Sequence, residues 1–163
     1  MTQVMVLGLG DIVHRDRGLG IHAVRDLYRE QWSRQVRFID RMMLGSSPLG
    51  LEGIDWLLVL NAWKTGMSPG TLTRLSLGQV LSQPGLVSEP ALWRGLALAD
   101  VLGQDVRVVF LGLEAEETTC DLMFSRTIQL AYPQFLAAVR EEIACMLGQV
   151  NADAAPAYDA VLA

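Results

Sequence analysis

The sequence is poor in the residues that mark nucleic-acid binding, zinc ribbons and redox centres. Lys64 is the only lysine and the formal net charge is −5 at pH 7, so the chain lacks a basic surface that could neutralise phosphates. Its two cysteines, Cys120 and Cys145, form no CxxC pair, and we expect two reduced, partly buried thiols. Acidic residues surround Cys120 and disfavour its thiolate, so a catalytic cysteine is not expected.

Long apolar runs are also missing. No stretch of about 18 apolar residues without charges occurs, so no membrane span is predicted. The N-terminus, MTQVMVLGLGD, lacks the charged region and the long apolar region of a signal peptide. These absences predict a cytoplasmic protein with no membrane insertion and no nucleic-acid partner.

The composition favours a folded chain. It has 163 residues, of which 51% are hydrophobic and 19% charged, which suits one domain with a sizeable core. We therefore predict a single domain over residues 1–163. The Ala-rich end, residues 151–163, is expected to be a loosely ordered tail.

Short apolar runs alternate with helical patterns along the chain. The predicted strands are Val4–Leu9, Val36–Ile39, Trp56–Leu60, the edge strand Thr71–Leu75, and Val106–Leu111. The predicted helices are Leu19 to about Ser33, Ala91–Leu102 and Phe124–Leu147, which Pro133 can break, with a short helix or turn at Ser46–Gly53. This alternation predicts an α/β fold: a doubly wound, mostly parallel sheet with helices on both faces.

In such sheets, ligands bind outside the carboxyl ends of the strands. The segments that follow predicted strands are therefore the candidate site. They are Asp11–Arg17, Asp40–Gly45, Asn61–Gly66 and Gly112–Glu117.

The first of these segments begins with Gly8-Leu9-Gly10, which is part of a dinucleotide fingerprint. Val13 stands where the third glycine belongs, and Asp11 and Asp16 would repel a pyrophosphate. Nucleotide binding is therefore not favoured, and the glycines are expected to permit a sharp turn.

The same segment gathers potential metal ligands. Asp11, His14, Asp16 and His22 carry carboxylates and imidazoles, which suit zinc or nickel. Structural roles compete with this interpretation. Asp11 can bond loop amides, Asp16 can cap the first helix, and His22 can face solvent.

Seven ordered segments carry a resemblance that covers nearly the whole chain. They are Val6–Ile12 (VLGLGDI), Asp16–Ile21 (DRGLGI), Leu58–Ala62 (LVLNA), Pro69–Thr71 (PGT), Gly95–Leu102 (GLALADVL), Val109–Glu114 and Phe124–Ile128. Together they resemble the hydrogenase maturation endopeptidases, whose pattern is roughly LGxGN followed by D-[DE]-G-x-G. The resemblance implies a doubly wound α/β fold. It also implies a role in cleaving the C-terminal extension from the large subunit of nickel–iron hydrogenases after nickel insertion.

The resemblance further implies three side chains that recognise the partner's nickel: a carboxylate, an aspartate and a histidine. At the matching positions this sequence has Arg17, Asn61 and Arg94. A guanidinium is always protonated and only donates, and asparagine offers one neutral carbonyl oxygen. At 4 Å, even two unit charges of one sign repel by about 4 kcal/mol in a partly screened site. We therefore expect no catalytic residue, no bound metal and no cofactor in this chain.

Three functions follow. The favoured one is a non-catalytic chaperone or assembly partner of the hydrogenase large subunit or another maturation factor, with Arg17 and Arg94 forming a cationic patch for a carboxylate. The second is an active endopeptidase that uses Asp16, Asp40 and His14 as substitute ligands. The third is a small-anion-binding module or enzyme on the same scaffold.

Two tryptophans adjoin the inferred site positions. Trp63 and Trp93 are candidate partner contacts, because tryptophan is enriched at the centres of interfaces. Packing in the core is the competing role, and for Trp63 the two roles are equally weighted.

Overall fold

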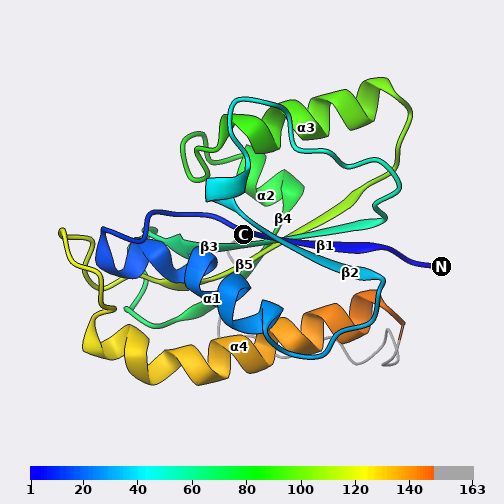
Figure 1. Ribbon diagram of the computed structural model, residues 1–163. Coiled ribbons are helices and arrows are strands. Elements are labelled where there is room, and N and C mark those ends of the chain that lie inside the picture. Colours follow the sequence, from blue (N-terminus) through cyan, green and yellow to red (C-terminus); the bar gives the residue numbers. More distant parts are fainter. Residues whose placement is uncertain (149–163) are drawn as a thin grey trace.

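A five-stranded sheet organises the chain in the computed structural model, which describes residues 1–148 (Figure 1). The strands are β1 (Val4–Gly8), β2 (Val36–Asp40), β3 (Trp56–Trp63), β4 (Leu72–Ser76) and β5 (Arg107–Glu114). Their order is β2-β1-β3-β5-β4, and all pairs are parallel except β4 with β5. The predicted α/β fold and the predicted edge strand are both confirmed.

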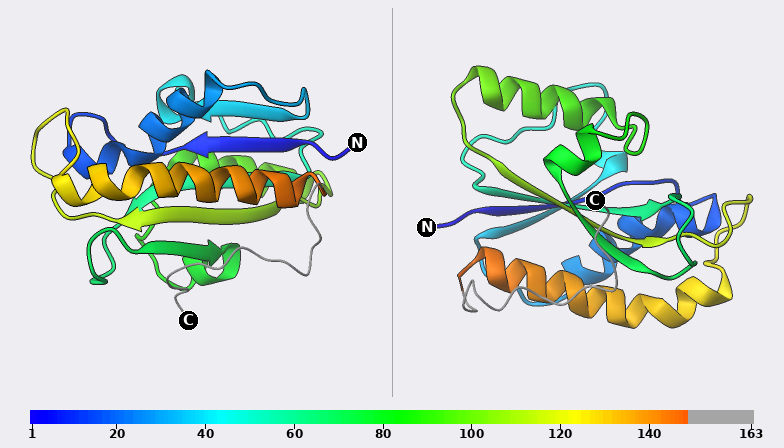
Figure 2. Two further views of the ribbon diagram at one scale, coloured as in Figure 1. Left: turned by 90° about the horizontal axis from the view of Figure 1, so that it is seen from below. Right: turned by 180° about the vertical axis from the view of Figure 1, so that it is seen from behind.

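Helices cover both faces of the sheet (Figures 1 and 2). One face carries α1 (Leu19–Tyr28) and α4 (Arg126–Met146), and the other carries α2 (Leu77–Leu81) and α3 (Pro90–Val101). Two short 3-10 helices, η1 (Arg15–Gly18) and η2 (Arg41–Met43), follow the ends of β1 and β2. The sheet is therefore buried on both faces, which explains why its strands read as apolar runs.

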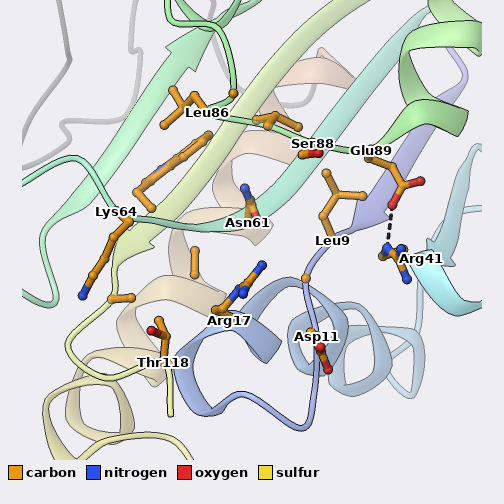
Figure 3. Close-up of a pocket in the computed structure, with 16 residues that line it drawn as sticks. Leu9, Asp11, Arg17, Arg41, Asn61, Lys64, Leu86, Ser88, Glu89 and Thr118 are labelled. Carbon is orange, nitrogen blue, oxygen red and sulfur yellow. Dashed lines mark ion pairs between the residues drawn. The ribbon is translucent and has the colours of Figure 1, made fainter. Parts of the chain in front are cut away.

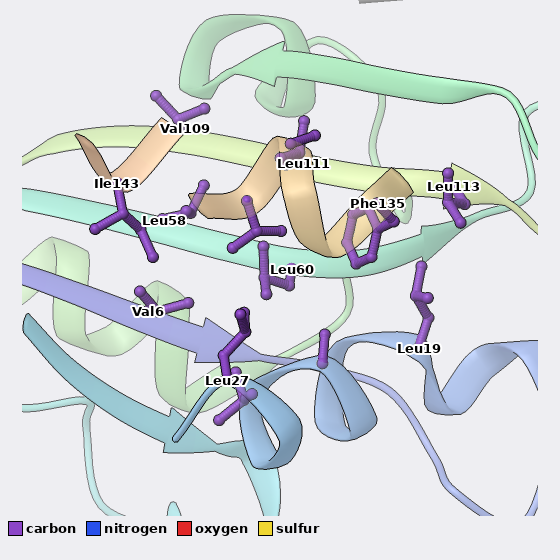
Figure 4. Close-up of a cluster of buried hydrophobic side chains, with 14 of the residues drawn as sticks. Val6, Leu19, Leu27, Leu58, Leu60, Val109, Leu111, Leu113, Phe135 and Ile143 are labelled. Atoms are coloured by element: carbon purple, nitrogen blue, oxygen red, sulfur yellow. The ribbon is translucent and has the colours of Figure 1, made fainter. Parts of the chain in front are cut away.

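Each face of the sheet has its own apolar core. On the α1/α4 side, Leu58 and Leu60 pack among side chains such as Leu27 and Phe135 (Figure 4). On the α2/α3 side, strand residues that alternate with these pack against the other helices. They include Met5, Leu57 and Phe110, which pack with Leu92 of α3. Burying one such large side chain stabilises the fold by about 1.5–3 kcal/mol.

Several predicted boundaries are wrong, and each has a local cause. Helix α1 ends at Tyr28 rather than near Ser33, because the Trp32 indole N–H donates to the Leu27 carbonyl at 2.7 Å. Helix α4 continues through Pro133, since buried residues on both sides of the proline hold it against the sheet. The predicted tail lies outside the described residues.

Other differences affect the segments that reach the site. Strands β3 and β5 continue to Trp63 and Glu114, three residues further than predicted, so Asn61 lies within β3 opposite Gly112. Residues 46–53 form no helix, and the predicted alternative, a turn, occurs at both ends of the segment. The unpredicted helix α2 begins with a capping box between Ser76 and Gln79.

None of the helices in residues 1–148 combines the length and the apolar character needed to cross a bilayer.

Candidate functional site

A cavity of about 460 Å³ lies at the carboxyl ends of β1 and β3 (Figure 3). The chain leaves β1 for β2 on one side, while β3 lies on the other side, so the cavity sits at the topological switch point of the sheet. All four segments predicted from the sequence contribute to its wall, through residues such as Asp11, Arg17, Arg41, Asn61 and Ala115. The sequence did not indicate the further wall formed by residues 85–89.

Two glycines bring α1 against the sheet beneath this cavity. A Cβ on Gly8 would lie 2.2 Å from the Gly20 carbonyl oxygen, and a Cβ on Gly20 would lie 2.1 Å from the Leu60 carbonyl oxygen. In a dinucleotide fingerprint the third glycine allows helix and strand to pack closely, and Val13 stands at that position here. Gly20 allows this close packing instead. This packing carries the residues just before α1 to the cavity.

The loop between β1 and α1 is held in one shape. Gly10 has a φ of 115°, and the Asp11 amide donates to the Arg17 carbonyl at 3.0 Å. Arg15 is in the left-handed region with a φ of 46°, which costs a non-glycine residue about 1 kcal/mol or more. Its amide donates to the Asp121 carbonyl, and its guanidinium pairs with Asp121 at 3.1 Å. The loop after β5 therefore fixes the position of Arg17.

Asp16 anchors this arrangement from inside the protein. Its side chain is fully buried, with 0% exposure. Its carboxylate accepts hydrogen bonds from the amides of Glu116, Glu117 and Ser125 and from the Ser125 hydroxyl, at 2.7–2.9 Å. The expectation that Asp16 caps the first helix is wrong, because no side chain caps η1 or α1. Its role is to tie the loop after β1 to the loop after β5.

Arg17 and Asn61 meet in the cavity, as their positions after β1 and in β3 predict. In Figure 3 the Arg17 side chain points toward Asn61. Arg17 is exposed, and its guanidinium makes no hydrogen bond or ion pair with any residue between 1 and 148. Two other arginines of this region, Arg15 and Arg41, pair with Asp121 and Glu89.

Arg94 does not belong to the site. It is exposed, donates to the Ser46 carbonyl at 3.2 Å, and does not line the cavity. Glu89, which lies at the start of α3 as its N-cap, lines the cavity instead. Glu89 is only 6% exposed and pairs with the Arg41 guanidinium at 2.6 Å (Figure 3). The predicted patch of Arg17 and Arg94 is therefore wrong.

The proposed metal ligands are not assembled. Asp11 lines the cavity, but its carboxylate accepts from the Val13 amide and from His14 Nδ1, at 3.0 and 2.8 Å. These two donors hold the pKa of Asp11 below its usual value. Within residues 1–148, no three His, Cys, Asp or Glu side chains are arranged to hold a metal ion.

Asp40 and His22 also have other roles. The buried Asp40 carboxylate accepts from the Met42 amide and from Arg25 Nε, and Asp40 does not line the cavity. The His22 ring stacks edge-on against Phe124, with centroids 5.1 Å apart, and burial lowers its pKa. The expectation that His22 faces solvent is wrong.

The two tryptophans differ in role. Trp63 lines the cavity but is only 1% exposed and donates to the Thr73 carbonyl, so its indole belongs to the core. Trp93 is half-buried, donates to the Val87 carbonyl, and packs against the core beside Phe110. Its side chain lines a second, smaller hollow rather than the main cavity, so a partner contact at Trp93 stays a prediction.

Both cysteines are free thiols. Cys145 is half-buried, and burial raises its pKa. Cys120 is exposed rather than partly buried as expected. Neither lines the cavity.

Solved structures that share this fold, with its sheet order and its helices on both faces, include hydrogenase maturation proteases. This confirms the resemblance carried by the sequence motifs. No protein-family model matches the sequence, and no curated protein matches it either.

Three solved structures illustrate the similarity. The hydrogenase 2 maturation peptidase of a Thaumarchaeota archaeon is 19% identical, with a TM-score of 0.64 over 87% of this chain and 98% of that one. HybD of Thermococcus kodakarensis, a NiFe hydrogenase maturation protease, is 15% identical, with a TM-score of 0.63 over 88% and 99%. The hydrogenase maturating endopeptidase HybD of Escherichia coli is 24% identical, with a TM-score of 0.59 over 86% and 94%.

Proposed function

We propose that this protein acts in the maturation of a nickel–iron hydrogenase large subunit as a docking or assembly factor that does not cleave its partner. The partner is the large subunit itself or another maturation factor. The similar structures are those of maturation proteases. The simplest proposal is that this chain shares with them a surface that fits a hydrogenase-related partner.

The proposal that the protein does not cleave its partner rests on one observation. Arg17 and Asn61 both line the cavity, and the Arg17 side chain points toward Asn61. These are two of the positions at which the family resemblance implies nickel recognition. A protonated guanidinium repels a divalent cation, and the Asn61 amide brings no charge that would offset this repulsion.

The alternative of an active endopeptidase with substitute ligands has little support. Asp16 already accepts four hydrogen bonds, and Asp40 is engaged by Arg25 and Met42. His14 is held by Asp11 outside the cavity wall. Recruiting these groups would require dismantling the loops that shape the cavity.

A pull-down with a hydrogenase large-subunit precursor tests this proposal. We expect wild-type protein to retain the precursor and leave its mass unchanged, and we expect Arg17→Glu to retain much less, because the charge in the cavity is reversed. The matched control is Arg34→Glu, an exposed arginine just before β2, at the opposite edge of the sheet. Arg94→Glu is also expected to bind normally, since Arg94 lies outside the cavity.

Two results would contradict the proposal. Shortening of the precursor by the purified protein would make it a protease. Failure of the wild-type protein to retain either a large-subunit precursor or any of the purified maturation factors would remove the docking role.

A further inference from the structure

The charged groups around the cavity do not balance. The wall carries three cations, Arg17, Arg41 and Lys64, and two anions, Asp11 and Glu89. Arg41 and Glu89 neutralise one another across 2.6 Å. The cavity is thus locally cationic in a chain whose net charge is −5.

Asp11, the remaining anion, has hydrogen-bond donors of its own. Arg17 and Lys64, the remaining cations, have no acidic side chain from residues 1–148 bonded to them. The Asp11 carboxylate is taken by the Val13 amide and the His14 ring. The Lys64 ammonium lies 3.4 Å from the Glu116 carbonyl, a neutral and distant acceptor. The Arg17 guanidinium makes no hydrogen bond or ion pair in the described part of the chain, although it interacts electrostatically with Asp11. Arg17 therefore points into the cavity without a hydrogen-bonded or ion-paired acidic side chain from the described residues, while the exposed Lys64 points away from Asn61 (Figure 3).

We propose that this cavity is a carboxylate-binding site centred on Arg17 and Asn61, and that its ligand is the carboxylate of a polypeptide. A guanidinium presents parallel N–H donors that match the two oxygens of a carboxylate. The Asn61 side-chain NH₂ adds a donor from β3, and Lys64, the residue after β3, adds positive charge to the wall. This inference rests on the proposed function and names the group of the partner that the site recognises.

The size of the cavity favours a polypeptide over a free small anion. Its volume of about 460 Å³ falls in the range of pockets that bury whole organic ligands, far above the needs of one carboxylate. Exposed apolar side chains also follow two segments of the wall. Met42 and Met43 come after Arg41 and are 62% and 71% exposed, and Leu122 and Met123 come after Thr118 and are 67% and 65% exposed. Flexible methionines suit the apolar residues that precede a bound carboxylate.

The test is an NMR titration of the full chain with N-acetyl-Ala-Leu-Ala, as the free acid and as the C-terminal amide. We expect the free acid to shift the Arg17 Nε–H and Asn61 side-chain NH₂ signals, and the amide to leave them unchanged at the same concentration. Arg17→Gln should weaken binding of the free acid by about tenfold or more, the effect of losing charge-assisted hydrogen bonds. Arg34→Gln serves as the matched control and should bind normally.

Acetate and inorganic phosphate form the other arms of the titration. Both are expected to shift the same signals only at much higher concentration than the peptide acid. Binding of either anion as tightly as the peptide acid would identify a free-anion site and overturn the peptide assignment. Equal binding of acid and amide, or normal binding by Arg17→Gln, would overturn the carboxylate site. Circular dichroism checks that this variant folds, and Arg17→Lys, which keeps the charge, is expected to restore part of the affinity.

This titration needs no hydrogenase protein, so its failure is distinguishable from that of the proposed function. If the peptide acid binds and no maturation partner is retained, the docking role is wrong while the site stands. If a partner is retained independently of Arg17 and the peptide acid does not bind, the site is wrong while the docking role stands.

Discussion

Replacing Asp16 with alanine is expected to lower the free energy of unfolding by about 3–5 kcal/mol, because several buried donors lose their acceptor at once. The substitution strands two donors of Ser125, which is itself buried, and the amides of Glu116 and Glu117. For a chain of this size, the loss corresponds to a fall in Tm of about 10 °C. Thermal and urea unfolding of the two proteins measure it.

The matched control for this substitution is Asp105→Ala. Asp105 is exposed, and exposed substitutions usually change stability by less than about 0.5 kcal/mol. Asp16→Asn keeps one acceptor oxygen and should fall between the control and Asp16→Ala. An Asp16→Ala protein that melts within a degree or two of wild type would show that these hydrogen bonds do not hold the loops of the site together.

The second large effect is a gain of metal binding. The double variant Arg17→Glu with Asn61→Asp removes the unpaired guanidinium and adds two carboxylates to a cavity that already contains Glu89. Unit charges 4 Å apart interact by about 4 kcal/mol in a partly screened site, so we expect the variant to bind nickel at least about a hundredfold more tightly than wild type. Isothermal titration with nickel measures this difference.

A charge control separates this effect from a general change of surface charge. The double variant Arg34→Glu with Arg94→Glu changes the net charge at least as much, at positions outside the cavity. It is expected to bind nickel no better than wild type. Wild-type protein that already binds nickel as tightly as the cavity variant would refute the claim that Arg17 disfavours a cation here.

The architecture was predictable because burial on both faces leaves a clear pattern. Parallel strands covered by helices become apolar runs, and residues just after those runs meet at one edge of the sheet. The segments that contain Arg17 and Asn61 were predicted in this way, and the family resemblance singled out these two residues. The ends of the elements were less predictable, since they depend on contacts such as the bond from Trp32 to Leu27 that ends α1.

The parts of the site that sequence reasoning missed depend on distant contacts. The donors to Asp16 lie about a hundred residues along the chain, so nothing near Asp16 distinguishes this role from helix capping. Glu89 had a usable signal. Pro90 is typical of the first helical position, which marks Glu89 as the residue that begins α3. The match of Gly95–Leu102 to the family's helix placed Arg94 at the site instead.

The most direct test of the account is to compare binding to the large-subunit precursor with and without inserted nickel, followed by mass spectrometry of the bound precursor. Because Arg17 and Asn61 stand at positions where the family resemblance implies nickel recognition, we predict equal affinity for the two forms and an unchanged precursor mass. Binding of the nickel-containing form alone, followed by loss of its C-terminal extension, would contradict it.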